Sequence, residues 1–454
     1  MGLANYIETA MKSILKNPIL EVLYDIKITK ILKQSNFVKR DVGYPPIQII
    51  LHFLYMLVMN KRQSTFIKKS NSAFGKDAYY RFVKESRYNW RKFLILSTTE
   101  LLQKIKPLHK NGEHRLLIID DTVEAKRGKY IEGSCKYIWS NKEHRSINAL
   151  NIVSLNYADS HSTFQLDFSI KMNNSQRKTT SEFITKLHHR SNAYHRKSEI
   201  IKGKNILAIE MLERALDSGV DADYLLVDSW YAKPNFIEQS NKLGMPVIAR
   251  LPNNKLIWNF KCKHKTMNAI YLSLKNSRHK HSGNHGKISY KYFDVIVEHA
   301  VLGEVKLVFL HTGKDLLVFI STDITIAGKE ILLTYKKRWN IEQGYKDLRN
   351  LFGLGKEENR IYEALIAKIT LSMFTYNIVS YINRINHEPQ TLGELFRDLE
   401  CELETLAISM QLFIQILTKI SEIQNVVKDN KDLLNIIAVL SAYTQKELGF
   451  MCES

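Results

Sequence analysis

Three acidic residues stand where the chain could carry out chemistry. Asp120 follows the apolar run Leu116–Ile119, and Asp228 follows a second apolar run, Tyr224–Val227. Short continuous apolar runs are typical of strands buried on both faces, which would place both acids at strand ends. The third acid, Glu342, stands among basic residues in a segment with helical spacing. Carboxylates that converge from strands and a helix can hold two Mg²⁺ ions, which activate a water or hydroxyl at a phosphodiester.

The segment that carries Glu342 has an unusual charged face. At about one hundred degrees per residue, Tyr335, Arg338, Glu342, Lys346 and Arg349 fall on one side of a single predicted helix. An adjacent apolar side would pack on the protein interior. The alternative is a surface helix whose acid and bases form ordinary ion pairs, each worth a few tenths of a kcal/mol. The rest of the chain has to decide between the two.

Composition favours a nucleic-acid partner. The chain has 454 residues, a formal net charge of +20 and a pI near 9.5, so it attracts polyanions. Its basic residues are spread along the chain, which favours nucleic acid over a membrane surface. The four cysteines show no CxxC spacing, as expected in a reducing cytoplasm. Two apolar stretches, 47–59 and 364–382, are predicted to be buried core helices and not membrane spans.

The pattern of elements predicts an α/β fold in several parts. Residues 1–105 show helical periodicity, and 106–251 alternate buried strands with helices around a sheet. Residues 252–322 read as a β-rich insertion. A helix from about Lys329 then returns the chain to the main domain over 323–385, and 386–454 is predicted to be helical, with amphipathic segments at 391–419 and 431–448.

Basic residues in two further places leave their roles open. The helical N-terminal part has basic positions that could hold DNA phosphates or simply form a solvated face. These positions are Lys61, Arg62, Lys68, Lys69, Lys84, Arg87, Arg91 and Lys92. A His-rich tract at 278–287 could bind metal, but its irregular spacing favours a solvated loop.

The charged helix resembles a known family, the DDE transposases of bacterial insertion sequences with a Tyr-x2-Arg-x3-Glu-x6-Lys pattern. Tyr335, Arg338 and Glu342 match this pattern in spacing. The last position departs from it, because Arg349 stands where the family has Lys. Arginine and lysine bind phosphate with different geometry, so Lys346, one turn earlier, is a second candidate for that contact.

The resemblance extends to both strand acids. Asp120-Asp121-Thr122 is similar to the family's first acidic strand, and Asp228-Ser229-Trp230 is similar to its second. Because relatives commonly read Asp-x-Thr, the resemblance favours Asp120 as the ligand and leaves Asp121 as the alternative. Taken singly, an aspartate after a strand more often caps a turn than binds a metal.

The resemblance implies a fold and a reaction. The fold is an RNase H-like mixed sheet flanked by helices, with the β-rich insertion before the catalytic helix. The reaction is cleavage at transposon ends with two Mg²⁺ ions, for which Mn²⁺ would substitute, followed by strand transfer into target DNA. Asp120, Asp228 and Glu342 would bind the metal, and the basic helix would hold phosphates. In members of the family, an aromatic residue of the insertion helps to hold a flipped base. Trp258 is a candidate for this role, and Trp230, just after the second acid, is another. The ordinary alternative is a tryptophan buried in the core.

The resemblance implies two partners. One is double-stranded DNA, both the terminal repeats and the target, and the other is a second copy of the chain in a synaptic dimer. The implied location is the bacterial cytoplasm. Two other functions remain open at this stage. One is an RNase H-like DNA nuclease without strand transfer, and the other is an inactive transposase-derived DNA-binding protein. The presence of all three acids argues against the inactive form.

Overall fold

The computed structural model divides the chain into two compact units. One comprises Met1–Leu101 with Asp347–Ser454, and the other comprises Leu102–Lys346. The five-part division predicted from the sequence stays a prediction. The structure describes residues 17–38, 43–61, 75–128, 130–140, 144–172, 187–252, 257–275, 281–285, 288–312, 315–356, 359–386 and 390–403.

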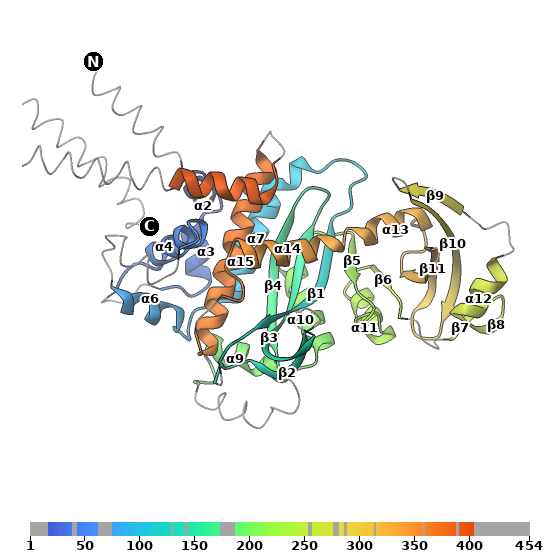
Figure 1. Ribbon diagram of the computed structural model, residues 1–454, viewed down its shortest axis with the longest axis horizontal. Coiled ribbons are helices and arrows are strands. Elements are labelled where there is room, and N and C mark those ends of the chain that lie inside the picture. The colour runs from blue at the N-terminus through green and yellow to red at the C-terminus, as the bar shows by residue number, and fades with distance from the viewer. Residues whose placement is uncertain are drawn as a thin grey trace, which may run out of the picture. The chain divides into compact units, whose positions relative to one another are not determined.

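The unit Leu102–Lys346 is built on one twelve-stranded sheet (Figure 1). Its main path runs β2-β3-β1-β5-β6-β12-β11-β10-β7-β8, while β4 pairs with β3 and β9 with β10. The strands are β1 Leu116–Ala125, β2 Cys135–Ser140, β3 Arg145–Ala158, β4 Thr163–Lys171, β5 Tyr224–Val227, β6 Val247–Arg250, β7 Ile257–Phe260, β8 Lys263–Thr266, β9 His281–His285, β10 Ile288–His299, β11 Gly303–His311 and β12 Leu316–Ser321.

The centre of the sheet mixes strand directions. β1 is antiparallel to β3, and β3 is antiparallel to β4, to which a short connection joins it. β5 is parallel to β1, and β6 is parallel to β5. Leu116–Ile119 and all of β5 are buried, as expected for strands covered on both faces. The predicted RNase H-like arrangement, a mixed sheet flanked by helices, is confirmed.

Two details of the sheet differ from expectation. β1 does not end at its acids but continues to Ala125, so Asp120 lies in mid-strand opposite Ser154 of β3. The polar residues still fit a strand because β3 supplies a hydrogen-bonded partner along the whole segment. In addition, the β-rich insertion extends the same sheet, since β12 pairs with β6.

Helices cover the sheet of this unit. α10 contacts β3 and β4, α11 contacts β6, and α13 contacts β6 and β10 to β12. The helices are α9 Asn192–Ser198, α10 Lys204–Asp217, α11 Pro234–Lys242, α12 Met267–Leu274, α13 Gly328–Lys336 and α14 Trp339–Asn350, which runs across the unit boundary, with a 3₁₀ turn at Glu199–Ile201.

The prediction of a single helix carrying Glu342 is wrong, because this segment forms two helices. α13 ends at Lys336, and α14 begins at Trp339. Between them, the amide N–H of Asn340 donates to the carbonyl of Lys337 at 2.9 Å, and that of Ile341 donates to the carbonyl of Arg338 at 3.1 Å. This i to i−3 spacing tightens the chain into a short turn, which sequence periodicity does not register.

The other unit is helical in its described residues. Its helices are α2 Pro18–Asp25, α3 Ile28–Gln34, α4 Pro46–Val58, α6 Lys76–Val83, α7 Trp90–Ile105, which runs across the unit boundary, and α15 Tyr362–Ile385. A 3₁₀ turn, Lys106–Leu108, follows α7. α15 is long and apolar enough to span a bilayer, but it is almost entirely buried and contacts α2, α4 and α6. The prediction that it and α4 are core helices is confirmed.

Some predictions fall on residues that the structure does not describe. These are the basic positions Arg62, Lys68 and Lys69, residues 278–280 and 286–287 of the His-rich tract, the predicted helix 431–448 and the part of 391–419 beyond residue 403. The rest of the tract, His281–His285, forms β9 paired with β10, so the loop predicted there is wrong.

Candidate active site

Asp120 and Asp228 belong to neighbouring parallel segments, Asp120 within β1 and Asp228 directly after β5. The last register pair between β1 and β5 joins Ile119 to Val227. Asp120 is the next residue of β1, and Asp228 is the first residue after the end of β5. Adjacent strands are about 4.8 Å apart, so the two backbones bring the acids side by side. The sheet therefore brings together two acids that are more than a hundred residues apart in the chain.

Arg338 joins the first acid to the third. Its Nη1 donates to Oδ2 of Asp120 at 2.8 Å, and its Nη2 donates to Oε1 of Glu342 at 2.9 Å. Asp120 and Arg338 are largely buried, and Glu342 is about one-third exposed. The turn between α13 and α14 thus places a guanidinium between a sheet carboxylate and a helix carboxylate.

Asp120 is held in a setting that disfavours its charge. Burial raises the pKa of Asp120 to about 6, and the charge of Asp228 adds to the rise. The Arg338 guanidinium and the amide N–H of Asp121, which donates to Oδ1 at 2.8 Å, act in the opposite direction. A carboxylate buried beside another carboxylate is a site that a cation stabilises.

Asp228 makes the turn contacts expected of an aspartate after a strand. Its Oδ1 accepts the amide N–H of Trp230 at 2.9 Å and that of Tyr231 at 3.3 Å. Its Oδ2 accepts no hydrogen bond from the residues that the structure describes. One oxygen therefore shapes the turn, and the other remains available to a ligand.

Asp121 points away from this group. Its Oδ2 lies 2.6 Å from Nζ of Lys204, and its Oδ1 accepts the hydroxyl of the buried Tyr231 at 3.3 Å. Successive side chains of a strand alternate between its faces. Asp120 therefore faces Arg338 and Glu342, whereas Asp121 is tied to α10 and the turn after β5.

The break between α13 and α14 divides the other residues of the predicted charged face between the two helices. Tyr335 is on α13, with its ring 4.9 Å from that of Phe319 and 5.9 Å from the Arg338 guanidinium. Burial raises the pKa of Tyr335. Lys346 is exposed on α14 at the end of its compact unit. Arg349 is on the same helix but belongs to the other unit, so its place relative to the acids is not described.

Tyr345 is a site residue that sequence reasoning missed. Its hydroxyl donates to the backbone carbonyl of Asp120 at 3.2 Å and lies 2.7 Å from Oγ of the buried Ser154. Asn156 in turn donates to Oγ of Ser154 at 2.9 Å. Tyr345 stands three residues after Glu342 and shares its face of the helix, and this spacing was the available signal.

The two tryptophans considered for base contact have opposite environments. Trp258 on β7 is 1% exposed, so its ring belongs to the core of the insertion. Trp230 is 45% exposed, and Nζ of Lys233 and of Lys204 lie 4.4 Å and 5.1 Å from its ring centroid. The structure thus excludes Trp258 as an accessible aromatic and leaves Trp230 beside Asp228.

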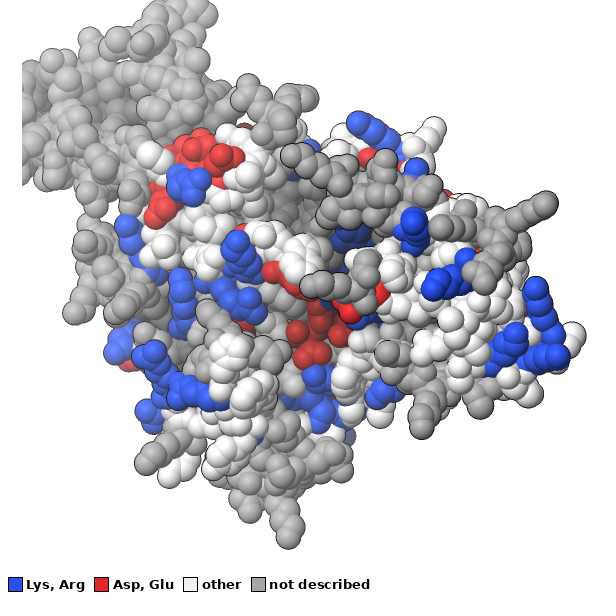
Figure 2. Space-filling view, turned by 45° about the vertical axis from the view of Figure 1, so that its right-hand side comes forward, with Lys and Arg blue, Asp and Glu red and all other residues white. Residues whose placement is uncertain are grey.

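The donor set suits a hard divalent cation, although the side chains are not gathered around one. Carboxylate oxygens are the ligands that Mg²⁺ prefers. Among the described residues, no three His, Cys, Asp or Glu side chains are grouped closely enough to hold a metal ion. In this arrangement the Arg338 guanidinium supplies the positive charge between Asp120 and Glu342. Figure 2 shows a group of acidic side chains near the middle of one face with Lys and Arg side chains beside it.

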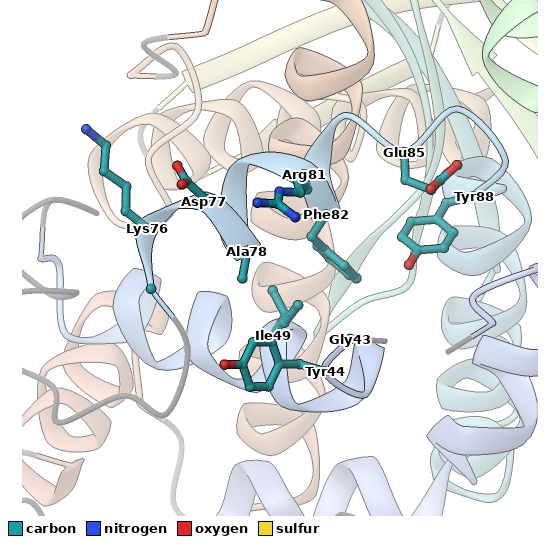
Figure 3. A pocket seen from close by; sticks show the side chains of 11 residues that line it. Gly43, Tyr44, Ile49, Lys76, Asp77, Ala78, Arg81, Phe82, Glu85 and Tyr88 are labelled. Carbon is teal, nitrogen blue, oxygen red and sulfur yellow. The ribbon is translucent and has the colours of Figure 1, made fainter. Parts of the chain in front are cut away.

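A separate cavity lies in the helical unit. It has a volume of about 580 Å³ and is lined by residues from the ends of α4 and α6 and the segments next to them (Figure 3). Arg81, Phe82 and Ile49 border the same space in Figure 3, and Asp77 and Glu85 add acidic groups to its wall. Neither Asp120, Asp228 nor Glu342 lines it.

The fold places the chain among α/β proteins with a large mixed sheet flanked by helices. Residues 50–266 match the family described as DDE superfamily endonuclease. The matched residues include Asp120 and Asp228 and end before α13 and α14. This match supports a DDE-type nuclease or transposase that cleaves DNA. No curated protein matches the chain.

Proposed function

We propose that the protein is an insertion-sequence transposase, which cleaves DNA at the ends of its element and transfers the freed 3′-hydroxyl to target DNA. The observation that carries this proposal is that Arg338 binds both Asp120 and Glu342, while Asp228 follows the strand that pairs with β1 beside Asp120. The match to DDE superfamily endonucleases supports the cleavage step. The charge of +20 supports a DNA substrate.

Asp120, Asp228 and Glu342 are the proposed metal ligands, with Mg²⁺ as the ion and Mn²⁺ as its substitute. Two bound ions would supply an activated nucleophile and stabilise the leaving oxygen. Asp120 is preferred to Asp121 because its carboxylate shares Arg338 with Glu342, whereas Asp121 is engaged by Lys204. Glu342 must exchange its contact with Arg338 for the ion.

Arg338 has two proposed partners at different stages. Before DNA binds, its guanidinium neutralises Asp120 and Glu342. A DNA phosphate binds the same bidentate donor well, so DNA would draw Arg338 away and release both carboxylates. Tyr335, whose ring lies beside the guanidinium, would orient it toward the phosphate.

Further contacts would come from the surface around the acids. Lys346 and Arg349 on α14 are proposed to bind phosphates, and Trp230 with its two lysines is proposed to contact a base or sugar. Two copies of the chain would bring two terminal repeats together in a synaptic dimer.

The test separates cleavage from joining. Full-length protein is incubated with Mg²⁺ and duplexes that carry the element's ends, either intact or already cleaved. We expect nicks on intact duplexes and joined products from pre-cleaved ones. Glu342→Gln should bind DNA normally and lose both products, whereas Glu213→Gln, an exposed helical acid of α10, should keep them. Substantial nicking by Glu342→Gln would contradict the site.

The second candidate, a DNA nuclease without strand transfer, is favoured by the endonuclease description of the matched family. It predicts nicks on intact duplexes and no joined product from pre-cleaved ends. An inactive DNA-binding protein would yield neither product. The same pair of substrates therefore distinguishes all three functions.

A further inference from the structure

Two strands project beyond the centre of the sheet as a β arm. The β1–β3 pairing ends at Ala125 and Ala149, and the β3–β4 pairing ends at Asn151 and Lys171. Residues of β3 before Ala149 pair only with β2 among the described strands. We call Cys135–Ser140 together with Arg145–Asn148 the β2–β3 arm (Figure 1).

The arm and the segment before it expose large aromatic side chains. Tyr137 is 82% exposed and Trp139 is 59% exposed, while Tyr130 in the preceding segment is 80% exposed. Single exposed apolar residues are ordinary, but three large aromatics within ten residues form a surface suited to a partner. Tyrosine and tryptophan supply large, rigid contact areas at such surfaces.

The backbone of the arm is shaped to present Tyr137. Tyr137 has a φ of 58°, in the left-handed region that residues other than glycine seldom adopt. It lies where β2 has one residue more than β3, between the pairs Cys135–Ala149 and Ile138–Ile147. Bulges of this kind redirect a side chain. The unfavourable backbone conformation of Tyr137 therefore occurs at a residue whose ring is turned toward solvent.

The charge around these aromatics is positive. Residues 126–148 contain six Lys or Arg and two Glu. Arg127, Lys136, His144 and Arg145 are exposed, and Glu132, the acid of this segment that the structure describes, lies 2.9 Å from Lys197. Aromatic rings interleaved with cations suit nucleic acid, which offers both stacking faces and phosphates.

The register relates the arm to the proposed active site. Trp139 pairs with Ser146 on β3, and Asp120 pairs with Ser154. Because these positions of β3 are an even number of residues apart, Trp139 and Asp120 share a face of the sheet. Eight residues of strand span about 26 Å, which is the length of roughly eight base pairs of DNA.

We propose that the β2–β3 arm is a second DNA contact, with Tyr137 and Trp139 against bases or sugars and Lys136 and Arg145 at phosphates. It binds duplex DNA roughly eight base pairs from the phosphate that faces Asp120. This inference rests on the proposed function only in taking DNA as the substrate, and it assigns the arm a share in affinity but none in chemistry.

The first test measures affinity in the catalytically silent Glu342→Gln background. Fluorescence anisotropy with a 5′-labelled duplex of about thirty base pairs gives Kd for Tyr137→Ser combined with Trp139→Ser. We expect at least about a fivefold weakening, because base stacking contributes about 1 to 3 kcal/mol per base. Leu272→Ser, which removes another exposed apolar side chain of the same compact unit, should leave Kd unchanged. An unchanged Kd in the double variant would overturn the inference.

Two more measurements define the contact. Lys136→Ala and Arg145→Ala should each lower the slope of log Kd against log salt by about one. A benzoylphenylalanine photocrosslinker in place of Tyr137 should mark DNA roughly eight base pairs from the nick site. A crosslink at the nick itself, or binding to phosphatidylserine vesicles that the double variant loses while its Kd for DNA is unchanged, would contradict the inference.

Failure of the arm and failure of the proposed function give different results. Loss of DNA affinity in the arm variants, with no nicking by the unmodified protein, would retain the arm and reject the transposase. Nicking with unchanged affinity in the arm variants would retain the enzyme and reject the arm. Thermal unfolding of each variant identifies any that fails to fold.

Discussion

Nη1 of Arg338 lies 2.8 Å from Oδ2 of Asp120, so a residue of the turn after α13 neutralises a carboxylate in the middle of β1. The same guanidinium also binds Glu342. Arg338, in the turn between α13 and α14, therefore interacts directly with two of the acids. Its substitution should affect metal and DNA in opposite directions.

Arg338→Ala should increase the affinity of the DNA-free protein for Mn²⁺, because the guanidinium and the ion compete for the same carboxylates. Nicking should fall, since the proposed phosphate contact is lost. Titration followed by electron paramagnetic resonance of free Mn²⁺ measures the first effect. Arg190→Ala, at an exposed arginine of the same unit, is the control. Weaker Mn²⁺ binding in Arg338→Ala would argue against the competition.

Asp120 should make the metal-free protein less stable as the pH rises from about 4 to about 6. The folded-state pKa of Asp120 is raised to about 6, so folded protein holds this proton over a range in which unfolded protein has lost it. The effect amounts to at most about 3 kcal/mol at 1.36 kcal/mol per pKa unit. Urea unfolding in EDTA across this range should show wild type losing stability relative to Asp120→Asn. A constant difference would contradict the raised pKa.

Tyr345→Phe should lower the free energy of unfolding by about 1 kcal/mol, because it removes the hydroxyl that joins α14 to Ser154 and to the Asp120 carbonyl. Chemical denaturation measures this change. Tyr194→Phe, on α9, should change stability little. If Tyr345→Phe is as stable as wild type, the hydroxyl network does not hold the helix to the sheet.

Substitution of Trp258 should affect stability, whereas substitution of Trp230 should affect DNA binding. Trp258→Ala should cost about 3 to 5 kcal/mol because it opens a cavity in a packed core. Trp230→Ala should change the free energy of unfolding by less than about 0.5 kcal/mol, as at other surface positions, and should weaken DNA binding. Thermal unfolding and anisotropy measure the two effects. Normal stability of Trp258→Ala would show that its ring is not part of the core.

The main elements of the fold could be predicted from the sequence because their signals are local. Leu116–Ile119 and Tyr224–Val227 are continuous apolar runs, and the structure shows both as buried strands. The end of β1 could not be predicted, because it depends on ten register pairs with β3. The break between α13 and α14 could not be predicted either, since neither proline nor glycine marks it.

The sequence by itself determined which residues carry the charge and the acids. It placed Tyr335, Arg338 and Glu342 at helical spacing and put Asp120 and Asp228 next to buried runs, because periodicity and burial are properties of short segments. Only the tertiary structure decided that Arg338 lies between Asp120 and Glu342 and that Asp121 faces Lys204. The Asp121–Lys204 contact joins residues 83 positions apart, and the Asp120–Arg338 contact joins residues 218 positions apart, so only the pairing of strands and the packing of helices bring them together.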